Sequence, residues 1–206
     1  MKPEQQLALT EYLSDFVTPE RQARIDAVLG QRTRYITLVA EDFHSPHNAS
    51  ALLRTCESFG VQDLHVVENF NTFKVRRGAA SGSAKWITIH RYDGESTDNT
   101  IACLNTLRSQ DYCIVTTTPG DNALPIEAIP LDQKIAIWFG SERDGVSQRA
   151  QAAADLRVSI PMVGFTESLN VSVSAALCLY VLTQRLRCLD VDWHLSKAEQ
   201  RSLRLD

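Results

Sequence analysis

The sequence lacks the features that mark a membrane, secreted or strongly basic protein. Its 206 residues contain no apolar run long enough to span a membrane, and the first residues lack the basic-then-apolar pattern of a signal peptide. We therefore expect a cytoplasmic protein without a membrane partner. Its net charge of −4 means that any RNA site has to be a local patch.

Metal-ligand spacings and nucleotide fingerprints are also missing. The five cysteines are odd in number and lie in apolar or helical segments, without a Cys-x-x-Cys pair or a Cys/His cluster. This pattern predicts reduced thiols and no bound metal. Neither a P-loop nor a dinucleotide-binding glycine motif is present, which disfavours nucleotide cofactors of those two kinds.

What the sequence does contain is an alternation of apolar runs and amphipathic segments. Residues 35–40 and 63–68 are predicted strands, and a helical pattern over residues 47–60 lies between them. This βαβ order predicts a parallel sheet with a right-handed crossover. Further strands are predicted at residues 85–89, 112–118, 134–139 and 158–162, and further helices at residues 97–109, 148–155 and 170–182.

Both ends of the chain are predicted to be short helical extensions of this α/β fold. Residues 3–29 are amphipathic and restart at Thr18 and Pro19, which suit a helix cap and a first helical position. We expect three parts, namely residues 1–34, 35–187 and 188–206, of which the last ends in a helix over residues 196–205.

Residues 74–92 carry five basic residues and no acidic residue, and their centre is small and flexible. This stretch is the best candidate in the chain for contacts with phosphates, through Arg76, Arg77 and Lys85. We interpret Trp86 and Tyr92, in the same stretch, as packing residues.

The helix predicted over residues 170–182 has no charged face before Arg185. Ser168 or Asn170 can cap its first turn. We expect the helix to be buried nearly all round, packed against a partner subunit as well as its own sheet.

Polar side chains follow three of the predicted strands. Asn48 and Arg54 follow the first strand, Glu142 lies in the glycine-rich loop 140–147, and Ser168 and Asn170 precede the last helix. In open α/β sheets ligands bind at the carboxyl ends of the strands, so we expect these groups to converge.

At these three places the sequence resembles a known family. The segments HNASALLRTCESFGV, IAIWFGSERDGVS and IPMVGFTESLNVSVSAAL are similar to the three motifs of the SpoU branch of the SPOUT methyltransferases, in the same order and spacing. The resemblance covers residues 35–182.

The resemblance implies a parallel sheet with helices on both faces, a deep C-terminal trefoil knot, and a homodimer in which both subunits contribute to each site. It also implies S-adenosylmethionine (SAM) as methyl donor and a tRNA ribose 2′-hydroxyl as acceptor, with guanosine 18 of the D-loop as the expected target. The alternatives are another tRNA or ribosomal RNA nucleotide, or an RNA-binding homologue without activity. In the three-part division, residues 35–187 would be the catalytic domain and residues 1–34 would contact RNA.

The resemblance also implies roles for individual residues. Arg54 would be the catalytic arginine, acting either as a base or as a cation that stabilises the alkoxide, and Asn48 would orient its neighbours. Three sets of residues complete the expected site: the polar positions Glu142, Ser168 and Asn170; the cofactor contacts Thr117, Gly140, Ile160 and Leu169; and the RNA contacts Arg76, Arg77, Lys85, Arg185 and Arg187.

Overall fold

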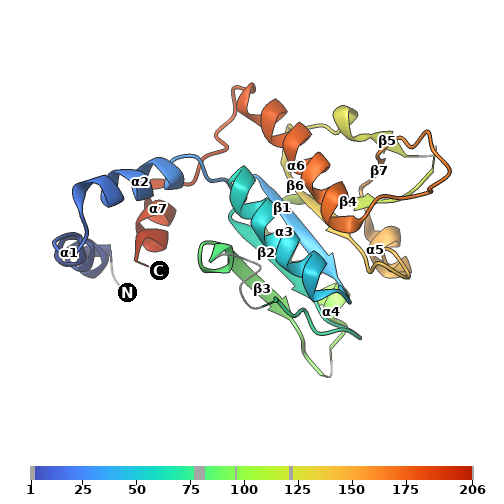
Figure 1. Cartoon of the computed structure of the whole chain (residues 1–206), viewed down its shortest axis with the longest axis horizontal. Helices are drawn as coiled ribbons and strands as arrows, with labels where there is room; N and C mark the ends of the chain where they lie inside the picture. The colour runs from blue at the N-terminus through green and yellow to red at the C-terminus, as the bar shows by residue number, and fades with distance from the viewer. Residues whose placement is uncertain (1–2, 77–81, 96, 121–122, 206) are drawn as a thin grey trace.

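A parallel β-sheet forms the centre of the computed structural model, which describes residues 3–76, 82–95, 97–120 and 123–205 (Figure 1). Within these residues the sheet has seven strands in the order β3-β2-β1-β6-β4-β7-β5, and every neighbouring pair is parallel. The strands are β1 (Ile36–Glu41), β2 (Asp63–Val67), β3 (Thr88–Tyr92), β4 (Tyr112–Thr117), β5 (Leu124–Pro125), β6 (Lys134–Phe139) and β7 (Leu156–Ser159). The predicted parallel α/β fold is confirmed.

Helices cover both faces of the sheet (Figure 1). Helices α3 (Pro46–Phe59) and α6 (Val171–Arg187) pack against each other on one face, and α4 (Asn99–Ser109) and α5 (Gln148–Ala153) pack together on the other. Each face has its own apolar core, because the central strands are buried on both sides. Leu52 and Leu179 belong to the first core, and Leu104 and Trp138 belong to the second.

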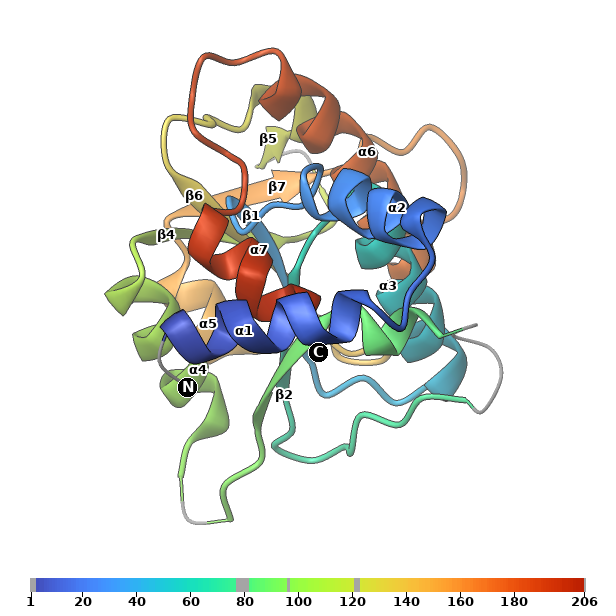
Figure 2. The same ribbon diagram turned by 90° about the vertical axis from the view of Figure 1, so that its left-hand side faces the viewer.

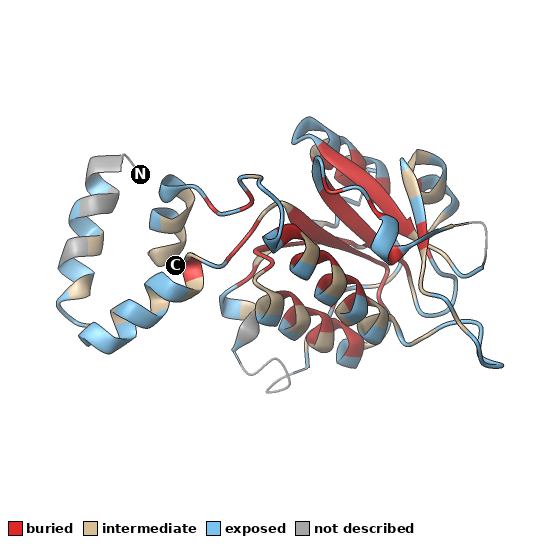
Figure 3. Ribbon diagram, turned by 90° about the horizontal axis from the view of Figure 1, so that it is seen from above, coloured by how far each residue is buried: buried red, intermediate tan, exposed pale blue. Residues whose placement is uncertain are grey.

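The two ends of the chain lie together beside the sheet. Helix α7 (Lys197–Arg204) contacts both α1 (Pro3–Ser14) and α2 (Pro19–Leu29) (Figures 1 and 2), and much of the surface of these helices is exposed (Figure 3). Thr18 caps α2 by accepting a hydrogen bond from the backbone of Arg21 at 3.3 Å, as predicted. Among the described residues, no helix is long and apolar enough to cross a membrane.

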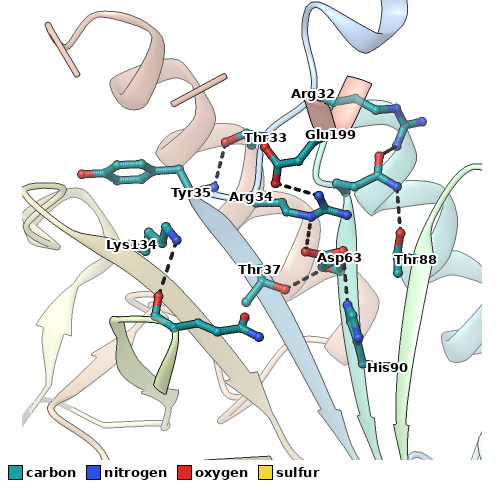
Figure 4. A network of polar contacts seen from close by, with 12 residues as sticks. Arg32, Thr33, Arg34, Tyr35, Thr37, Asp63, Thr88, His90, Lys134 and Glu199 are labelled. Carbon is teal, nitrogen blue, oxygen red and sulfur yellow. Dashed lines mark hydrogen bonds and ion pairs between the residues drawn. The ribbon is translucent and has the colours of Figure 1, made fainter. Parts of the chain in front are cut away.

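Arg34 ties α7 to the sheet (Figure 4). Its Nη1 donates to Glu199 on α7 at 2.7 Å, and its Nε donates to Asp63 at the start of β2 at 2.8 Å. Burial by itself raises the pKa of Asp63, but the contacts with His90 and Arg34 outweigh it and hold the pKa below its usual value. The C-terminal helix is therefore anchored at the amino ends of β1 and β2.

The predicted strand over residues 85–89 is wrong in its position. The carbonyl oxygen of Trp86 accepts hydrogen bonds from Arg32 Nη1 at 2.9 Å and from Gln62 Nε2 at 3.2 Å. These bonds hold Trp86 outside the ladder, so β3 begins at Thr88. Trp86 is also 43% exposed, which corrects its interpretation as a packing residue.

Three further expectations need correction. The helix predicted at residues 170–182 continues to Arg187. In the single chain Val173, Leu177 and Tyr180 lie on its exposed side, and the expected packing of this side against a partner subunit stays a prediction. Helix α3 begins at Pro46, after the cap Ser45, and α5 ends at Ala153 because the next strand already begins at Leu156. The short edge strand β5 was not predicted. The trefoil knot stays a prediction.

Candidate active site

Asn48 joins the three polar segments that were predicted to converge. The residue is only 5% exposed and lies in the first turn of α3. Its Nδ2 donates to Glu142 Oε1 at 2.7 Å, and its Oδ1 accepts a hydrogen bond from Asn170 Nδ2 at 3.1 Å. The structure thus brings together α3, the loop after β6 and the start of α6. Glu142 and Asn170 lie 94 and 122 residues after Asn48 in the sequence.

The orientation of both amides follows from the helix that Asn170 caps. Asn170 Oδ1 accepts from the backbone N–H of Ser172 at 2.9 Å and from its hydroxyl at 2.6 Å. This leaves Asn170 Nδ2 to donate to Asn48, whose own Nδ2 must then point to Glu142. Asn170 therefore caps α6, whereas Ser168, the other predicted cap, is exposed in the preceding loop.

Glu142 accepts hydrogen bonds from the side chain of Asn48 and from the backbone just before α3. Besides Asn48, the backbone N–H groups of His44 and Ser45 donate to its carboxylate at 3.0 and 3.3 Å. Burial alone raises the pKa of Glu142, but these hydrogen bonds outweigh burial and lower the pKa below its ordinary value. Glu142 is therefore a fixed negative charge near neutral pH.

Glycines shape the loop that carries Glu142. The backbone groups of Ser141 and Gly145 exchange two hydrogen bonds, of 3.1 and 3.0 Å. A Cβ atom at Gly140 would lie 1.9 Å from the carbonyl oxygen of Gly145, so only glycine fits at position 140. Gly145 itself has φ +69°, a conformation that other residues rarely adopt.

The far end of the same loop is fixed by Glu41, the last residue of β1, which was not among the candidate site residues. Glu41 is 2% exposed and accepts four hydrogen bonds. Two come from the backbone and hydroxyl of Ser147, at 3.0 and 2.8 Å, and the others from Thr100 at 2.7 Å and Trp138 Nε1 at 2.9 Å. A carboxylate that directly follows the apolar run 35–40 was the available signal.

A cavity of about 470 Å³ opens at the carboxyl ends of β4, β6 and β7, and Glu142 and Asn170 are part of its lining. This volume is within the range of small-molecule sites. Its lining contains all four residues predicted to contact the cofactor (Thr117, Gly140, Ile160 and Leu169) and three of the predicted polar positions (Glu142, Ser168 and Asn170).

The cavity lining fits SAM. Apolar side chains such as Ile126, Val158 and Leu169 suit an adenine ring, and the carboxylates of Glu142 and Glu167 suit a positively charged ligand. The Thr117 hydroxyl donates to the carbonyl oxygen of Trp138 at 3.0 Å, which ties the end of β4 to its neighbour β6.

Arg54 lies apart from the cavity. It is exposed on α3, six residues after Asn48, and it does not belong to the cavity lining. Within the described parts of the chain, its guanidinium has no hydrogen-bond or ion-pair partner. The single chain therefore leaves the predicted catalytic arginine available to a substrate rather than engaged in packing.

The predicted RNA contacts are dispersed. Arg76, Lys85 and Arg187 are exposed, whereas Arg185 is partly buried and its Nη2 donates to the carbonyl oxygen of Ile129 at 2.7 Å. Arg77 lies outside the described residues. Lys85 lines a second cavity of about 440 Å³, between α2, α7 and the start of β3, that sequence reasoning missed. Its lining is strongly basic, with Arg21, Arg24, Arg32 and Arg204.

The fold and the site define an α/β enzyme that binds a small molecule at the carboxyl ends of parallel strands. The SpoU rRNA Methylase family matches residues 35–180, and the chain belongs to this family.

The relatives of the chain cover most of its length. A protein from Borreliella burgdorferi named tRNA (guanosine(18)-2'-O)-methyltransferase is 41% identical over 193 residues, which are 94% of this chain and 86% of the relative. The crystal structure of the Aquifex aeolicus TrmH/SpoU tRNA modifying enzyme has a TM-score of 0.78 at 27% identity and covers 90% of this chain and 93% of that one. AviRb from Streptomyces viridochromogenes, solved in complex with the cofactor AdoMet, shares the fold at 20% identity, with a TM-score of 0.62 over 78% of this chain and 61% of that one.

Proposed function

We propose that the chain transfers a methyl group from SAM to a ribose 2′-hydroxyl of tRNA, and that the target is guanosine 18 of the D-loop. The observation that carries the proposal is the convergence of Asn48, Glu142 and Asn170 beside a cavity that contains all four predicted cofactor contacts. The name of the relative that is 41% identical over 94% of the chain supports the substrate and the position.

The loops around the cavity would hold SAM largely through their backbone, at Thr117, Gly140, Ile160 and Leu169. When bound, SAM supplies a methyl group that its sulfonium already activates. The chain positions the groups around SAM and supplies the negative charge of Glu142. Asn48 fixes Glu142 and Asn170 relative to each other, and Glu41 fixes the end of the loop that carries Glu142.

Arg54 would act on the ribose. A 2′-hydroxyl is a weak nucleophile until its proton leaves, and a guanidinium near the hydroxyl stabilises the developing alkoxide. Arg54 is exposed on α3, and its planar guanidinium can donate to a ribose oxygen and a phosphate together. The cationic role therefore fits the geometry better than the role of a base.

The exposed cations Arg76, Lys85 and Arg187 would contact tRNA phosphates, together with the helical extensions of residues 1–34 and 188–206 that flank the catalytic domain, residues 35–187. Arg185 is a weaker candidate because a backbone carbonyl already occupies its guanidinium. Arg77 keeps its predicted role in the same basic stretch.

A homodimer would cover the apolar surface near the cavity. Val163 and Phe165, in the loop before α6, are fully exposed, and Val173, Leu177 and Tyr180 form the uncovered side of α6. An isologous contact between two copies buries such a surface against itself. Light scattering that shows only monomers at micromolar concentration with SAM present would exclude the homodimer.

Methyl transfer to unmodified tRNA transcripts with labelled SAM tests the proposed function. The product should contain one 2′-O-methylated nucleotide, guanosine 18, recognised because the following phosphodiester resists alkaline cleavage. A label at another nucleotide would overturn the target, and RNA binding without any transfer would indicate a non-catalytic homologue.

A further inference from the structure

We infer that the loop of residues 68–76, which follows β2, presents Phe70 as a stacking platform for an RNA base next to the nucleotide that is methylated. The inference rests on the proposed function, because it requires RNA at the site described above. Phe70 is 91% exposed, although hydrogen bonds fix the backbone of its loop. The exposure of the ring is therefore a feature of an ordered loop.

Asp42 builds the loop. One carboxylate oxygen, Oδ1, accepts the backbone N–H groups of Asn69, Phe70 and Asn71 at 2.8, 2.8 and 3.1 Å. The carbonyl oxygen of Asp42 accepts a fourth hydrogen bond, from Asn71 Nδ2 at 3.1 Å. Asp42 is 9% exposed and has φ +52°, which aspartate tolerates better than most residues. The backbone of Phe70 is therefore fixed relative to the end of β1.

The same contacts connect the loop to the candidate active site. Asn71 Oδ1 lies 3.4 Å from His44 Nδ1, and the backbone N–H of His44 donates to Glu142 at 3.0 Å. Farther along the loop, the backbone N–H of Arg76 donates at 2.9 Å to Ser50, one helical turn before Arg54 on α3. The loop thus extends from the Glu142 network to the side of α3 that carries Arg54.

Charge identifies RNA as the occupant. Lys74 and Arg76 are exposed on the same loop, and within the described residues neither side chain forms an ion pair. The acidic residue of the loop, Glu68, is already paired with Arg91 at 2.9 Å. An exposed ring flanked by free cations matches the chemistry of single-stranded nucleic acid, in which the ring stacks on a base and the cations contact phosphates. A site for a protein partner would instead be expected to have apolar residues around Phe70.

The test is the affinity for an unmodified tRNA transcript, measured by filter binding without SAM. Phe70→Ala should weaken binding on the order of tenfold, the scale of one lost stacking contact. Phe70→Trp should retain the affinity, and Phe70→Leu, which keeps apolar volume without a ring, should behave like alanine. In methyl transfer, KM for tRNA should rise while kcat changes little.

Two further measurements distinguish base stacking from an ionic contact with phosphate. Phe70→Ala should shift the log–log salt plot without changing its slope, whereas Arg76→Ala should lower the slope by about one. Asp42→Ala should lose affinity like Phe70→Ala, and the double variant should lose little more, because both changes remove the same platform.

Equal tRNA affinity of Phe70→Ala and the parent chain would overturn the platform and leave the proposed function intact. Equal affinity of Phe70→Leu and the parent would overturn the stacking role in particular. Because the assay contains no SAM, failure of methyl transfer by the parent chain would contradict the proposed function without affecting this comparison.

Discussion

Replacing Asn48 by aspartate should reverse the pH dependence of the stability that Glu142 contributes. In the parent, Asn48 Nδ2 donates to Glu142 at 2.7 Å. Aspartate has nearly the same shape but no donor, so Asn48→Asp places a second carboxylate against Glu142. Asn48→Ala is the control without an added charge; it removes the same hydrogen bond and also the one from Asn170, which aspartate can still accept.

The structure sets the expected magnitude. Loss of a hydrogen bond to a charged group costs about 1.5–3 kcal/mol, and both variants share this cost. Two charges about 4 Å apart repel by about 4 kcal/mol at an effective dielectric constant of 20, and solvent around the exposed Glu142 reduces this to about 1–2 kcal/mol. Relative to Asn48→Ala, the free energy of unfolding of Asn48→Asp should therefore fall by about 1–2 kcal/mol between acid and neutral pH.

The sign of the pH dependence distinguishes the two variants. The parent holds the pKa of Glu142 below its ordinary value, so the stability that Glu142 contributes is present near neutral pH and is lost in acid. In Asn48→Asp the facing carboxylates raise the pKa of the pair in the folded state. The contribution of this pair to stability is then highest in acid and is lost as the pH rises through that pKa.

Urea unfolding from pH 5 to pH 8, at constant protein concentration, measures this difference. The difference between the curves for Asn48→Asp and Asn48→Ala should change with pH, with Asn48→Asp losing stability relative to Asn48→Ala from pH 5 to pH 8. Parallel curves would show that Asn48 and Glu142 do not interact as described, and the structural basis of the site would have to be abandoned.

Three other changes test separate parts of the structure. Glu41→Gln should lower the free energy of unfolding by about 2–4 kcal/mol, because an amide cannot accept all four hydrogen bonds that fix the cavity loop. The same change should weaken SAM binding in calorimetry, and an unchanged SAM affinity would refute the link between Glu41 and the cavity. Burial first, and then the charge of His90, lowers the pKa of His65 to about 4 from 6.5. The parent should thus lose up to about 3 kcal/mol as the pH falls from about 6.5 to about 4, and His65→Asn should not show this component in urea titrations. Arg54→Ala should reduce kcat on the order of 100-fold or more with SAM binding retained, and Arg54→Lys should rescue little of it; single-turnover transfer by Arg54→Ala near the parental rate would exclude the role.

Much of the fold follows from local patterns. The apolar β-branched runs of β1, β2, β4 and β6 are strands that are buried on both faces of the sheet. Gly60, with φ +77°, ends α3. The start of β3 did not follow, because it depends on Arg32 and Gln62, which bind the carbonyl oxygen of Trp86. Such tertiary hydrogen bonds have no local signal.

The same distinction applies to the site. The motif spacing placed Asn48, Glu142 and Asn170 at the strand ends, and the structure joins them through two hydrogen bonds. The role of Glu41 was missed because its four donors come from three separate segments. The residues on the exposed side of α6 could not be named in advance, because the apolar pattern of a helix does not distinguish burial in its own chain from burial against a second copy.

The most direct test of the central claim uses a tRNA transcript in which guanosine 18 is replaced by 2′-deoxyguanosine. This transcript keeps the base and the fold of the D-loop but lacks the hydroxyl that should receive the methyl group. We expect the parent chain to bind it and to transfer no label from SAM, while the matched ribose transcript is fully methylated. Transfer to the deoxy transcript at a rate near that of the ribose transcript would contradict the claim.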